Sequence, residues 1–396
     1  MTETSIHLKA GREKSVLARH PWIFASAVDR VEGKPQSGET VLVKDSRLQI
    51  IALAAFSPAS QIRARVWSLD VDETIDDAFL RARIAASIDR RKNLMDTENT
   101  NALRLIYGEA DGLPGLIVDQ FRDTLVLQIL SVGPEKFRKE IIDVLDDLLH
   151  PRNICERSDV DVRILEGLEE RHGLVRGSES NDDLVINENG IQYLVDVNEG
   201  QKTGFYIDQR RNRQKVFELA KNCDVLNCFC YTGGFTLNAL AGGAASVLSV
   251  DSSMPALEQL KRNVMINGLD EAKSQVLEGD VFKLLRLFRD QAKSFDLIIL
   301  DPPKFAPTIS QAEKAARAYK DINLLAIKLL RPGGILVTFS CSGGISRDLF
   351  QKIIAGAALD AHADLQIIDQ LSQSPDHPVL MSFPESFYLK GLICKK

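Results

Sequence analysis

The sequence predicts a multi-domain protein whose C-terminal half is a doubly wound α/β sheet. Three observations support this fold class. The chain has 396 residues, more than a single hydrophobic core usually serves. Residues 1–72 are rich in short β-like runs, and from about residue 184 apolar strands alternate with helical patterns. We therefore expect a β-rich domain at 1–72, a small central α+β domain at 73–183 and an α/β domain at 184–396.

In the first segment, E-T-V-L-V-K-D and I-R-A-R-V-W alternate apolar and polar residues, as half-buried strands do. Residues 1–65 carry ten Lys and Arg against six Asp and Glu, a charge of +4. The whole chain has a net charge of −6, so −10 is left for the remainder. A basic patch on an acidic protein suits specific docking onto a polyanion. An ordinary solvated surface is the alternative interpretation.

The central segment begins with a helical pattern in which apolar residues share one face: Phe79, Leu80, Ile84 and Ile88. Two strands follow around the turn-rich G-E-A-D-G-L-P-G, and a second helix is expected through Phe137, Ile141, Leu145 and Leu148. A short strand is expected at 153–155. The polar stretch G-S-E-S-N-D-D at 177–183 is typical of a linker.

Seven strands are expected in the last segment, five of parallel type followed by two that close the chain. They are D-V-L-N-C-F, S-V-L-S-V-D, S-Q-V-L-E-G-D, F-D-L-I-I-L-D, G-I-L-V-T-F-S, L-Q-I-I-D and F-Y-L-K-G-L-I-C-K. In an open sheet of this kind, ligands bind at the carboxyl ends of the strands. A functional site is therefore expected at the carboxyl ends of these strands.

Four consecutive strand ends carry glycine or carboxylate groups. Gly233 and Gly234 follow the first strand, where they allow backbone amides to approach a ligand closely. Asp251 ends the second strand and suits the hydroxyls of a ribose. Asp280 follows the third strand, within reach of an adenine edge, and Asp301 follows the fourth. A helix cap is the alternative role for any one of them.

The glycine loop lacks the G-x-G-x-x-G of dinucleotide sites, and no G-x-x-x-x-G-K-[ST] occurs in the chain. The site therefore suits a nucleoside without phosphates, which predicts S-adenosylmethionine as cofactor. The six cysteines form no C-x-x-C pair and the six histidines lack ligand spacing, so we expect no metal. No apolar run reaches the ~20 residues of a membrane span, and no signal-like segment opens the sequence. A cytoplasmic protein without a membrane partner is expected.

The motif S-C-S places Cys341 at the end of the fifth strand, beside the D-P-P-K that follows the fourth. Carbon 5 of a pyrimidine is a weak nucleophile, and addition of a thiolate to carbon 6 activates it for methylation. Cys341 is therefore the candidate nucleophile, next to a rigid D-P-P loop that can hold a planar base and present hydrogen-bonding groups to its edge. Taken alone, a thiol at a strand end is more often a packed core residue.

D-P-P-K supports a second possibility. In amino-methyltransferases of the [DN]-P-P-[YF] type an aromatic residue follows the prolines and stacks on the base. Here Lys304 stands at that position and Phe305 comes next. Methylation of an exocyclic amine, with Cys341 structural, is the alternative reaction. A non-catalytic RNA-binding factor and a small-molecule methyltransferase are more distant alternatives.

Taken together, these motifs resemble the bacterial ribosomal RNA large subunit methyltransferase I family, which makes 5-methylcytosine in 23S rRNA. The resemblance covers essentially the whole chain. It rests on A-R-H-P-W-I-F, Y-G-E-A-D-G-L-P-G-L-I-V-D, G-Q-K-T-G-F-Y-I-D-Q-R-R-N-R, C-Y-T-G-G-F, L-D-P-P-K-F and S-C-S. It implies a β-rich PUA-like barrel that binds RNA, a small central α+β domain and a C-terminal Rossmann-like, seven-strand α/β class I methyltransferase.

The same resemblance implies the site residues. Cys341 corresponds to the family's nucleophile, and the glycine loop with Gly233, Asp251 and Asp280 to its cofactor site. We expect Phe229, Tyr231 and Asp301 to contact the cofactor as well, and Asp301 to act as a catalytic residue that binds the cytosine edge. Many RNA cytosine-5 methyltransferases carry a second cysteine in the fourth-strand loop, where this chain has Lys304.

For the 23S rRNA substrate we expect contacts from Lys202, Arg210, Lys304 and Phe305. Arg211 and Arg213 are further candidates for phosphates, and Phe205 or Tyr206 for stacking. The alternative is an amphipathic entry segment with solvated arginines. The pattern leaves the oligomeric state open, with a homodimer one option.

Overall fold

The computed structural model describes residues 4–178, 183–305 and 311–396, which form two compact units. Unit 1 comprises residues 1–186, 195–207 and 375–386, and unit 2 comprises residues 187–194, 208–374 and 387–396. Two short segments from the C-terminal half thus cluster with the N-terminal half. The division into three contiguous domains remains a prediction, and most of the predicted linker at 177–183 lies outside the described residues.

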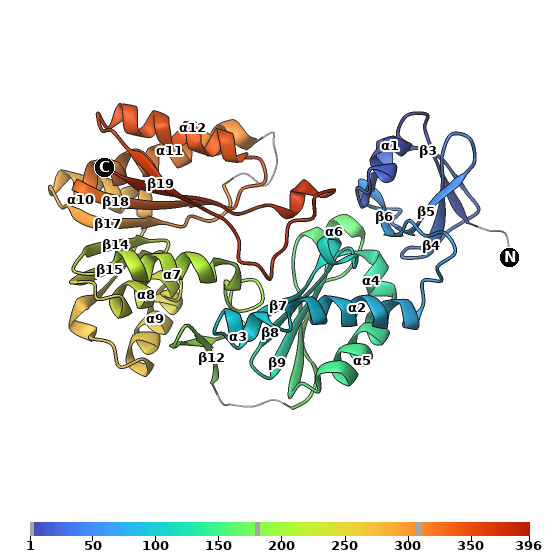
Figure 1. Ribbon diagram of the computed structural model, residues 1–396, viewed down its shortest axis with the longest axis horizontal. Helices are drawn as coiled ribbons and strands as arrows, with labels where there is room; N and C mark the ends of the chain where they lie inside the picture. The colour runs from blue at the N-terminus through green and yellow to red at the C-terminus, as the bar shows by residue number, and fades with distance from the viewer. Residues whose placement is uncertain (1–3, 179–182, 306–310) are drawn as a thin grey trace. The chain divides into compact units, whose positions relative to one another are not determined.

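The first part of unit 1 is a six-stranded sheet in the order β2-β6-β5-β4-β1-β3 (Figure 1). Its strands are β1 (Ser5–Leu8), β2 (Trp22–Phe24), β3 (Val28–Glu32), β4 (Thr40–Lys44), β5 (Ile50–Phe56) and β6 (Ile62–Ser68). A short helix, α1 (Glu13–Leu17), and the 3-10 turn η1 (Ala25–Ala27) connect them. The predicted alternation is present in β4, where Val41 and Val43 are buried and their neighbours are not.

The second part of unit 1 is a five-stranded sheet in the order β11-β10-β9-β8-β7. The strands are β7 (Ala102–Tyr107), β8 (Leu116–Phe121), β9 (Thr124–Ile129), β10 (Asn153–Ser158) and β11 (Arg171–Arg176). The helices are α2 (Asp77–Arg91), α3 (Leu94–Thr97), η2 (Gly108–Asp111), α4 (Val132–Lys136), α5 (Arg138–Leu149) and α6 (Val162–Glu166).

Helices α2 and α5 are the two that the apolar spacing predicts. Asp76 begins α2 by accepting a hydrogen bond from the amide of Phe79 at 3.0 Å. Phe79, Leu80 and Ile84 are buried, as expected, in one core with Ile141 and Leu145 of α5. Burial of these apolar faces against the sheet is the main stabilisation of both helices.

Unit 2 contains the predicted seven-stranded sheet, in the order β16-β15-β14-β17-β18-β20-β19 (Figure 1). The strands are β14 (Asp224–Cys228), β15 (Ser246–Asp251), β16 (Ser274–Glu278), β17 (Phe295–Leu300), β18 (Leu330–Ser340), β19 (Gln366–Leu371) and β20 (Lys390–Lys395). The pairs among β14 to β18 are parallel, and β20 runs antiparallel to both β18 and β19. The strand order reverses at β14, and open sheets of this kind bind ligands at the carboxyl ends of the strands beside such a reversal.

Helices cover both faces of this sheet (Figure 1). They are α7 (Arg210–Leu219), α8 (Gly234–Ala241), α9 (Met254–Ile266), α10 (Val281–Asp290), α11 (Ala312–Leu329) and α12 (Arg347–Asp360), with the 3-10 turn η4 (Glu271–Lys273). Residues of α10, α11 and α12 share one core with the inner strands. Ser253 and Ser346 begin α9 and α12 by accepting a hydrogen bond from an amide of the first turn.

The remaining elements are short. Strands β12 (Leu184–Glu188) and β13 (Ile191–Val195) form a separate two-stranded sheet, which the sequence pattern does not predict. The described residues also include the 3-10 turns η3 (Ile207–Gln209) and η6 (Pro384–Ser386). None of the helices in the described parts of the chain is long and apolar enough to cross a bilayer.

Candidate active site

The four predicted strand ends lie together at the carboxyl edge of the seven-stranded sheet, because β14 to β17 are parallel and adjacent. Asp251 is the last residue of β15, Asp280 follows β16 and Asp301 follows β17. The loop after β14 carries Phe229, Tyr231 and Gly233. Parallel pairing of β18 with β17 adds Cys341 to the same edge.

The loop after β14 has an unusual backbone conformation. Phe229, Tyr231 and Gly233 have φ angles of 60°, 47° and 88°. Such angles favour glycine, and an aromatic residue adopts them only where neighbouring groups hold it there. Tyr231 N donates to Asp251 Oδ2 at 2.8 Å, and Asn263 Nδ2 of α9 donates to the carbonyl of Thr232 at 2.9 Å. The loop is therefore fixed by side chains from two other elements.

Asp251 and Asp280 have different local roles. Asp251 accepts from Tyr231 N through Oδ2 and from Ser253 N through Oδ1, at 2.8 and 3.0 Å. Each of these oxygens has a second lone pair, which can accept from a hydroxyl. Asp280 is exposed and begins α10, where Oδ1 accepts from the amide of Lys283 at 3.1 Å. Helix capping, the alternative interpretation from sequence, is therefore present at Asp280.

These groups have the chemistry that S-adenosylmethionine requires. Carboxylates at the ends of two adjacent strands offer acceptors to ribose hydroxyls and to an adenine amine. The loop between β14 and α8 brings backbone amides and two aromatic side chains to the same edge. Gly233 admits no side chain, because a Cβ there would lie 2.5 Å from Leu260 Cγ. Phe229, Tyr231, Asp251 and Asp280 are the residues that would hold the cofactor.

Cys341 directly follows β18 and is half-buried. Its Sγ lies 4.0 Å from the carbonyl oxygen of Pro302, in the D-P-P-K loop after β17. In the same loop, Asp301 Oδ2 accepts from Gln209 Nε2 at 3.0 Å. The thiol and the carboxylate thus stand on adjacent strands of one edge, as the sequence predicts for S-C-S and D-P-P-K.

Ser342 joins three elements around the thiol. Its Oγ accepts from the amide of Phe305 at 3.1 Å and lies 3.0 Å from the hydroxyl of Tyr319 on α11. Its carbonyl accepts from Lys390 Nζ, at the start of β20, at 2.8 Å. Burial raises the pKa of Tyr319 to about 12, so this phenol stays protonated at neutral pH. Ser342, the residue directly after Cys341, is therefore held in place.

Lys390 is 4% exposed and stands opposite Ser340 in the β18–β20 register. Burial lowers the pKa of its ammonium to about 8, Cys341 opposes that shift by charge, and Lys304 adds to it. The sequence pattern does not single out this buried amine, which interacts electrostatically with Cys341. The only signal for it is a lysine within the otherwise apolar F-Y-L-K-G-L-I-C-K.

The other cysteines differ from Cys341 in position or burial. Cys155, Cys228, Cys230 and Cys394 are buried, and burial raises the pKa of each thiol. Cys223 is half-buried, like Cys341, but precedes β14 and so lies at the opposite edge of the sheet. Cys341 alone combines partial exposure with the carboxyl edge.

The predicted substrate contacts differ in accessibility. Lys304 is exposed. Phe305 packs against Phe282 and Tyr319, with ring centroids 5.9 and 4.8 Å apart. Lys202 is exposed and places its Nζ over the ring of Tyr206 at 4.2 Å, within unit 1.

Arg210 is fully buried, and its Nε lies 3.8 Å from Glu188. Arg213 is also buried, and it donates to both oxygens of Glu188 at 2.7 and 2.6 Å. An exposed phosphate does not reach a guanidinium in such an interior position. The burial of Arg210 and Arg213 therefore argues against the predicted phosphate contacts.

Comparisons with known proteins agree with this geometry. The family model described as S-adenosylmethionine-dependent methyltransferase matches residues 175–390, and that of a PUA-like domain matches residues 6–69. The ribosomal RNA large subunit methyltransferase I of Cronobacter sakazakii is 51% identical over 98% of both chains. The protein of the same name from Aeromonas salmonicida is 50% identical, again over 98% of both.

The chain belongs to the ribosomal RNA large subunit methyltransferase I family. Its cofactor is S-adenosylmethionine, and its N-terminal domain is PUA-like. Solved structures agree on the fold. An S-adenosylmethionine-dependent methyltransferase from Streptococcus mutans has a TM-score of 0.85 at 22% identity, over 99% of this chain and 100% of that one. A methyltransferase solved in complex with SAH has a TM-score of 0.87 at 22% identity, over 100% of both chains.

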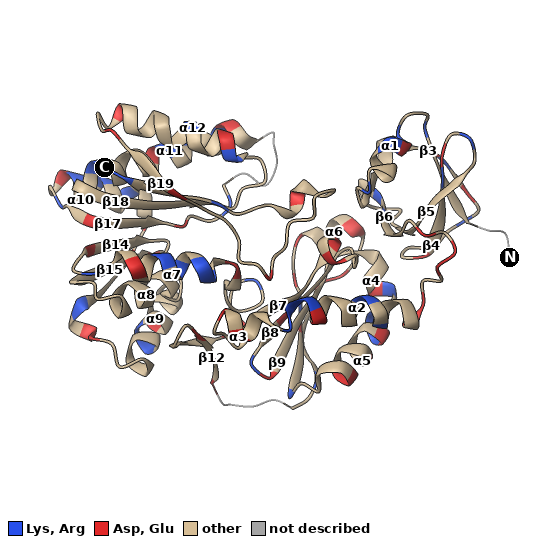
Figure 2. Ribbon diagram, viewed as in Figure 1, with Lys and Arg blue, Asp and Glu red and all other residues tan. Residues whose placement is uncertain are grey.

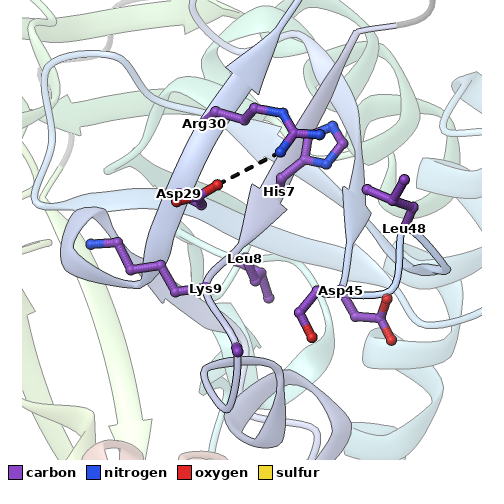
Figure 3. A pocket seen from close by; sticks show the side chains of 9 residues that line it. His7, Leu8, Lys9, Asp29, Arg30, Asp45 and Leu48 are labelled. Carbon is purple, nitrogen blue, oxygen red and sulfur yellow. Dashed lines mark ion pairs between the residues drawn. The ribbon is translucent and has the colours of Figure 1, made fainter.

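The PUA-like domain of this family member offers two polar surfaces. The first is a cavity of about 230 Å³ on the six-stranded sheet, with His7 and Leu48 in its lining (Figure 3). Its lining includes two cations, Lys9 and Arg30, and two carboxylates, Asp29 and Asp45, so its charges balance. Arg30 and Asp29 also pair with each other, at 3.7 Å. This cavity does not favour a polyanion.

The second surface is the segment around α1, where Figure 2 shows several basic positions. Lys9, Arg12, Lys14 and Arg19 are exposed within eleven residues, with Glu13 as the one acid among them. We call these four side chains the α1 basic segment. Most of the +4 excess that the sequence places in residues 1–65 is therefore concentrated in one short stretch.

Proposed function

We propose that this chain methylates carbon 5 of a cytosine in 23S rRNA through a transient covalent bond between Cys341 and carbon 6. Relatives at about half identity carry the name ribosomal RNA large subunit methyltransferase I, which supports ribosomal RNA as the substrate. The observation that carries the choice of carbon 5 is the half-buried Cys341 thiol at the carboxyl edge, 4.0 Å from the Pro302 carbonyl.

When bound, S-adenosylmethionine supplies a methyl group on a positively charged sulfur. The Cys341 thiolate adds to carbon 6 of the cytosine, and the electron pair of the 5,6 double bond becomes available at carbon 5. Carbon 5 then forms the bond to the methyl group as the bond between that methyl and the sulfonium sulfur breaks, and the electron pair of the broken bond stays on the sulfur. Loss of the carbon 5 proton to a base and departure of the Cys341 thiolate restore the aromatic ring and the enzyme.

Asp301 is placed to orient the base in this reaction. A carboxylate accepts hydrogen bonds, and the exocyclic amine of cytosine donates them. Gln209 Nε2 already donates to Oδ2 of Asp301 at 3.0 Å, which fixes the carboxylate. Lys304, exposed and two residues after the first proline, is available to a phosphate of the substrate.

The test uses radiolabelled S-adenosylmethionine and protein-free 23S rRNA, followed by nucleoside chromatography. Wild type should place label in 5-methylcytosine, and Cys341→Ala should not, while both bind the cofactor equally. Cys223→Ala is the matched control, because Cys223 is similarly exposed at the other edge of the sheet. Full activity of Cys341→Ala would overturn the mechanism. Label on an exocyclic nitrogen would instead support the amine methyltransferase.

The α1 basic segment supports RNA docking by the PUA-like domain. We expect Arg12→Ala, Lys14→Ala and Arg19→Ala together to weaken binding to 23S rRNA without changing affinity for S-adenosylmethionine. Each lost phosphate contact should reduce the slope of log affinity against log salt by about 0.7–0.9. Filter binding at several salt concentrations measures this slope. A triple variant with an unchanged slope would move the docking surface elsewhere.

A further inference from the structure

The reactive thiol has a charged neighbour that the function proposed above does not use. Lys390 is 4% exposed, although lysine is almost never buried without a partner. Its Nζ donates to the Ser342 carbonyl at 2.8 Å, one residue beyond Cys341. In the β18–β20 register Lys390 stands opposite Ser340, one residue before Cys341. The backbone of Lys390 therefore pairs with the residue before Cys341, and its side chain binds the residue after it.

A hydrogen bond to one carbonyl does not explain a buried charge. A neutral donor would satisfy the Ser342 carbonyl at a smaller cost of desolvation. Two charged groups act on the amine: Lys304, which disfavours its charge, and Cys341, which favours it. Tyr319 is a further titratable group, close enough to interact with both Cys341 and Asp301, and its phenol stays neutral.

We propose that Lys390 is a positioning residue that keeps Cys341 in its thiolate form. The ammonium is desolvated, and its bond to the Ser342 carbonyl fixes it one residue from Cys341. Electrostatic interaction between two groups is mutual, so a thiolate that favours the charged lysine is itself favoured by that lysine. This inference rests on the proposed function for its purpose, but the thiolate can be measured without RNA or cofactor.

The charge state of Lys390 suits this role at neutral pH. With a pKa of about 8, the amine is protonated in roughly nine molecules of ten at pH 7. As the pH rises through 8 the ammonium is lost, and its support of the thiolate is lost with it. Below that pH the support is present.

The experiment follows alkylation of the Cys341 peptide by iodoacetamide between pH 5 and 10, with mass spectrometry, in the full chain. Lys390→Met should shift the midpoint of the profile upward by about one pH unit, which lowers the rate at pH 7 about tenfold. Lys390→Arg keeps a permanent cation and should retain most of the rate. An unchanged midpoint in Lys390→Met would overturn the proposal.

Lys396→Met is the matched control. Lys396 also donates to backbone carbonyls, those of Ile327 and Leu330 at 2.8 and 2.7 Å, and burial lowers its pKa as well. It lies about 20 Å along β20 from Lys390, too far to act on the sulfur. If Lys396→Met shifted the alkylation midpoint of Cys341 as much as Lys390→Met does, the shift would come from a general loss of order in β20. That result would overturn the proposal.

Three other cysteines report on the state of the same molecule. Burial, Asp296 and Asp224 raise the pKa of Cys223, so it should label slowly and equally in all variants. Cys228 and Cys394 are buried and label only if unit 2 unfolds. If Lys390→Met shifts the midpoint but wild type makes no 5-methylcytosine, the proposed function is wrong and the role of Lys390 stands. If wild type makes 5-methylcytosine but Lys390→Met leaves the midpoint unchanged, the role of Lys390 is wrong and the proposed function stands.

Discussion

The two edges of the seven-stranded sheet both carry charges and one half-buried cysteine, but their charges have different partners. At the amino edge, Arg331 pairs with Asp224 at 2.9 Å and with Asp296 at 2.5 Å. At the carboxyl edge, Asp251 accepts from two backbone amides, and Lys390 donates to a backbone carbonyl. Arg331 and its two carboxylates neutralise each other, whereas Asp251 and Lys390 bind backbone groups of the loops beside the strand ends.

This difference indicates which edge acts on a ligand. A side chain that neutralises another has its interaction complete within the protein and serves stability. A carboxylate that orders a loop keeps lone pairs for a ligand. The environments of the two cysteines follow the same division. Burial, Asp296 and Asp224 disfavour the thiolate of Cys223, while the Lys390 ammonium binds the carbonyl of the residue after Cys341.

The largest expected effect is on stability, and it distinguishes an alanine substitution at the carboxyl edge, Gly233→Ala, from one at the amino edge, Gly333→Ala. In Gly233→Ala the new Cβ would lie 2.5 Å from Leu260 Cγ, at a φ of 88°. Clash and backbone strain together should lower the free energy of unfolding by about 3 kcal/mol. Gly333→Ala at the amino edge has a φ of 78° but no atom within 4 Å, so about 1 kcal/mol is expected. Urea denaturation followed by circular dichroism measures both, and equal losses would contradict the comparison.

A smaller effect, on binding, is expected from a carboxylate at each edge. Asp251→Ala leaves two loop amides without their acceptor, so affinity for S-adenosylmethionine should fall about 30-fold, or ~2 kcal/mol. Asp224→Ala removes a carboxylate of the amino edge and should leave that affinity unchanged. Calorimetry with each variant measures the difference. If Asp224→Ala weakened binding as much, the division between the edges would fail.

The smallest effect is expected from Arg331→Met. Its ion pairs are partly exposed, with Arg331 38% and Asp224 39% accessible, so the loss of stability at pH 7 should be under ~1 kcal/mol. Ser246 and Arg331 lower the pKa of Asp224. A carboxylate whose pKa is lower in the folded than in the unfolded chain stabilises the fold at a pH above its unfolded pKa, near ~4. This stabilisation is lost as the pH falls through the folded pKa.

The difference between wild type and Arg331→Met should therefore be present at pH 7 and vanish below about pH 3. Thermal unfolding as a function of pH measures it. Methyl transfer by this variant should match wild type. A difference that grew towards acid pH would mean that Arg331 acts on some group other than a carboxylate.

Much of this architecture could be predicted from the sequence, because local patterns determine it. Strands β14 to β18 alternate with helices along the chain, and the strand-end position of Asp251 and Cys341 follows from parallel pairing. The role of Lys390 could not be predicted in this way. It lies 49 residues after Cys341 (390 − 341), and only the antiparallel register that sets it opposite Ser340 brings it near.

Arg210 illustrates a second limit of local patterns. The cluster of arginines in R-R-N-R looks like a surface for phosphates, since arginine is mostly exposed. In the structure Arg210 is buried near the carboxylate of Glu188, which belongs to the β12–β13 sheet. The sequence pattern does not predict that sheet. A local pattern identifies a charge, but its partner is set by contacts between distant segments.

The conformation of the loop after β14 has a consequence for each round of catalysis. Phe229 and Tyr231 hold left-handed backbone angles, at a cost of about 1–2 kcal/mol per residue. The chain meets that cost once, when it folds. A cofactor that enters and leaves in every cycle then finds the loop already shaped, so exchange of spent for fresh cofactor requires no refolding of the binding loop.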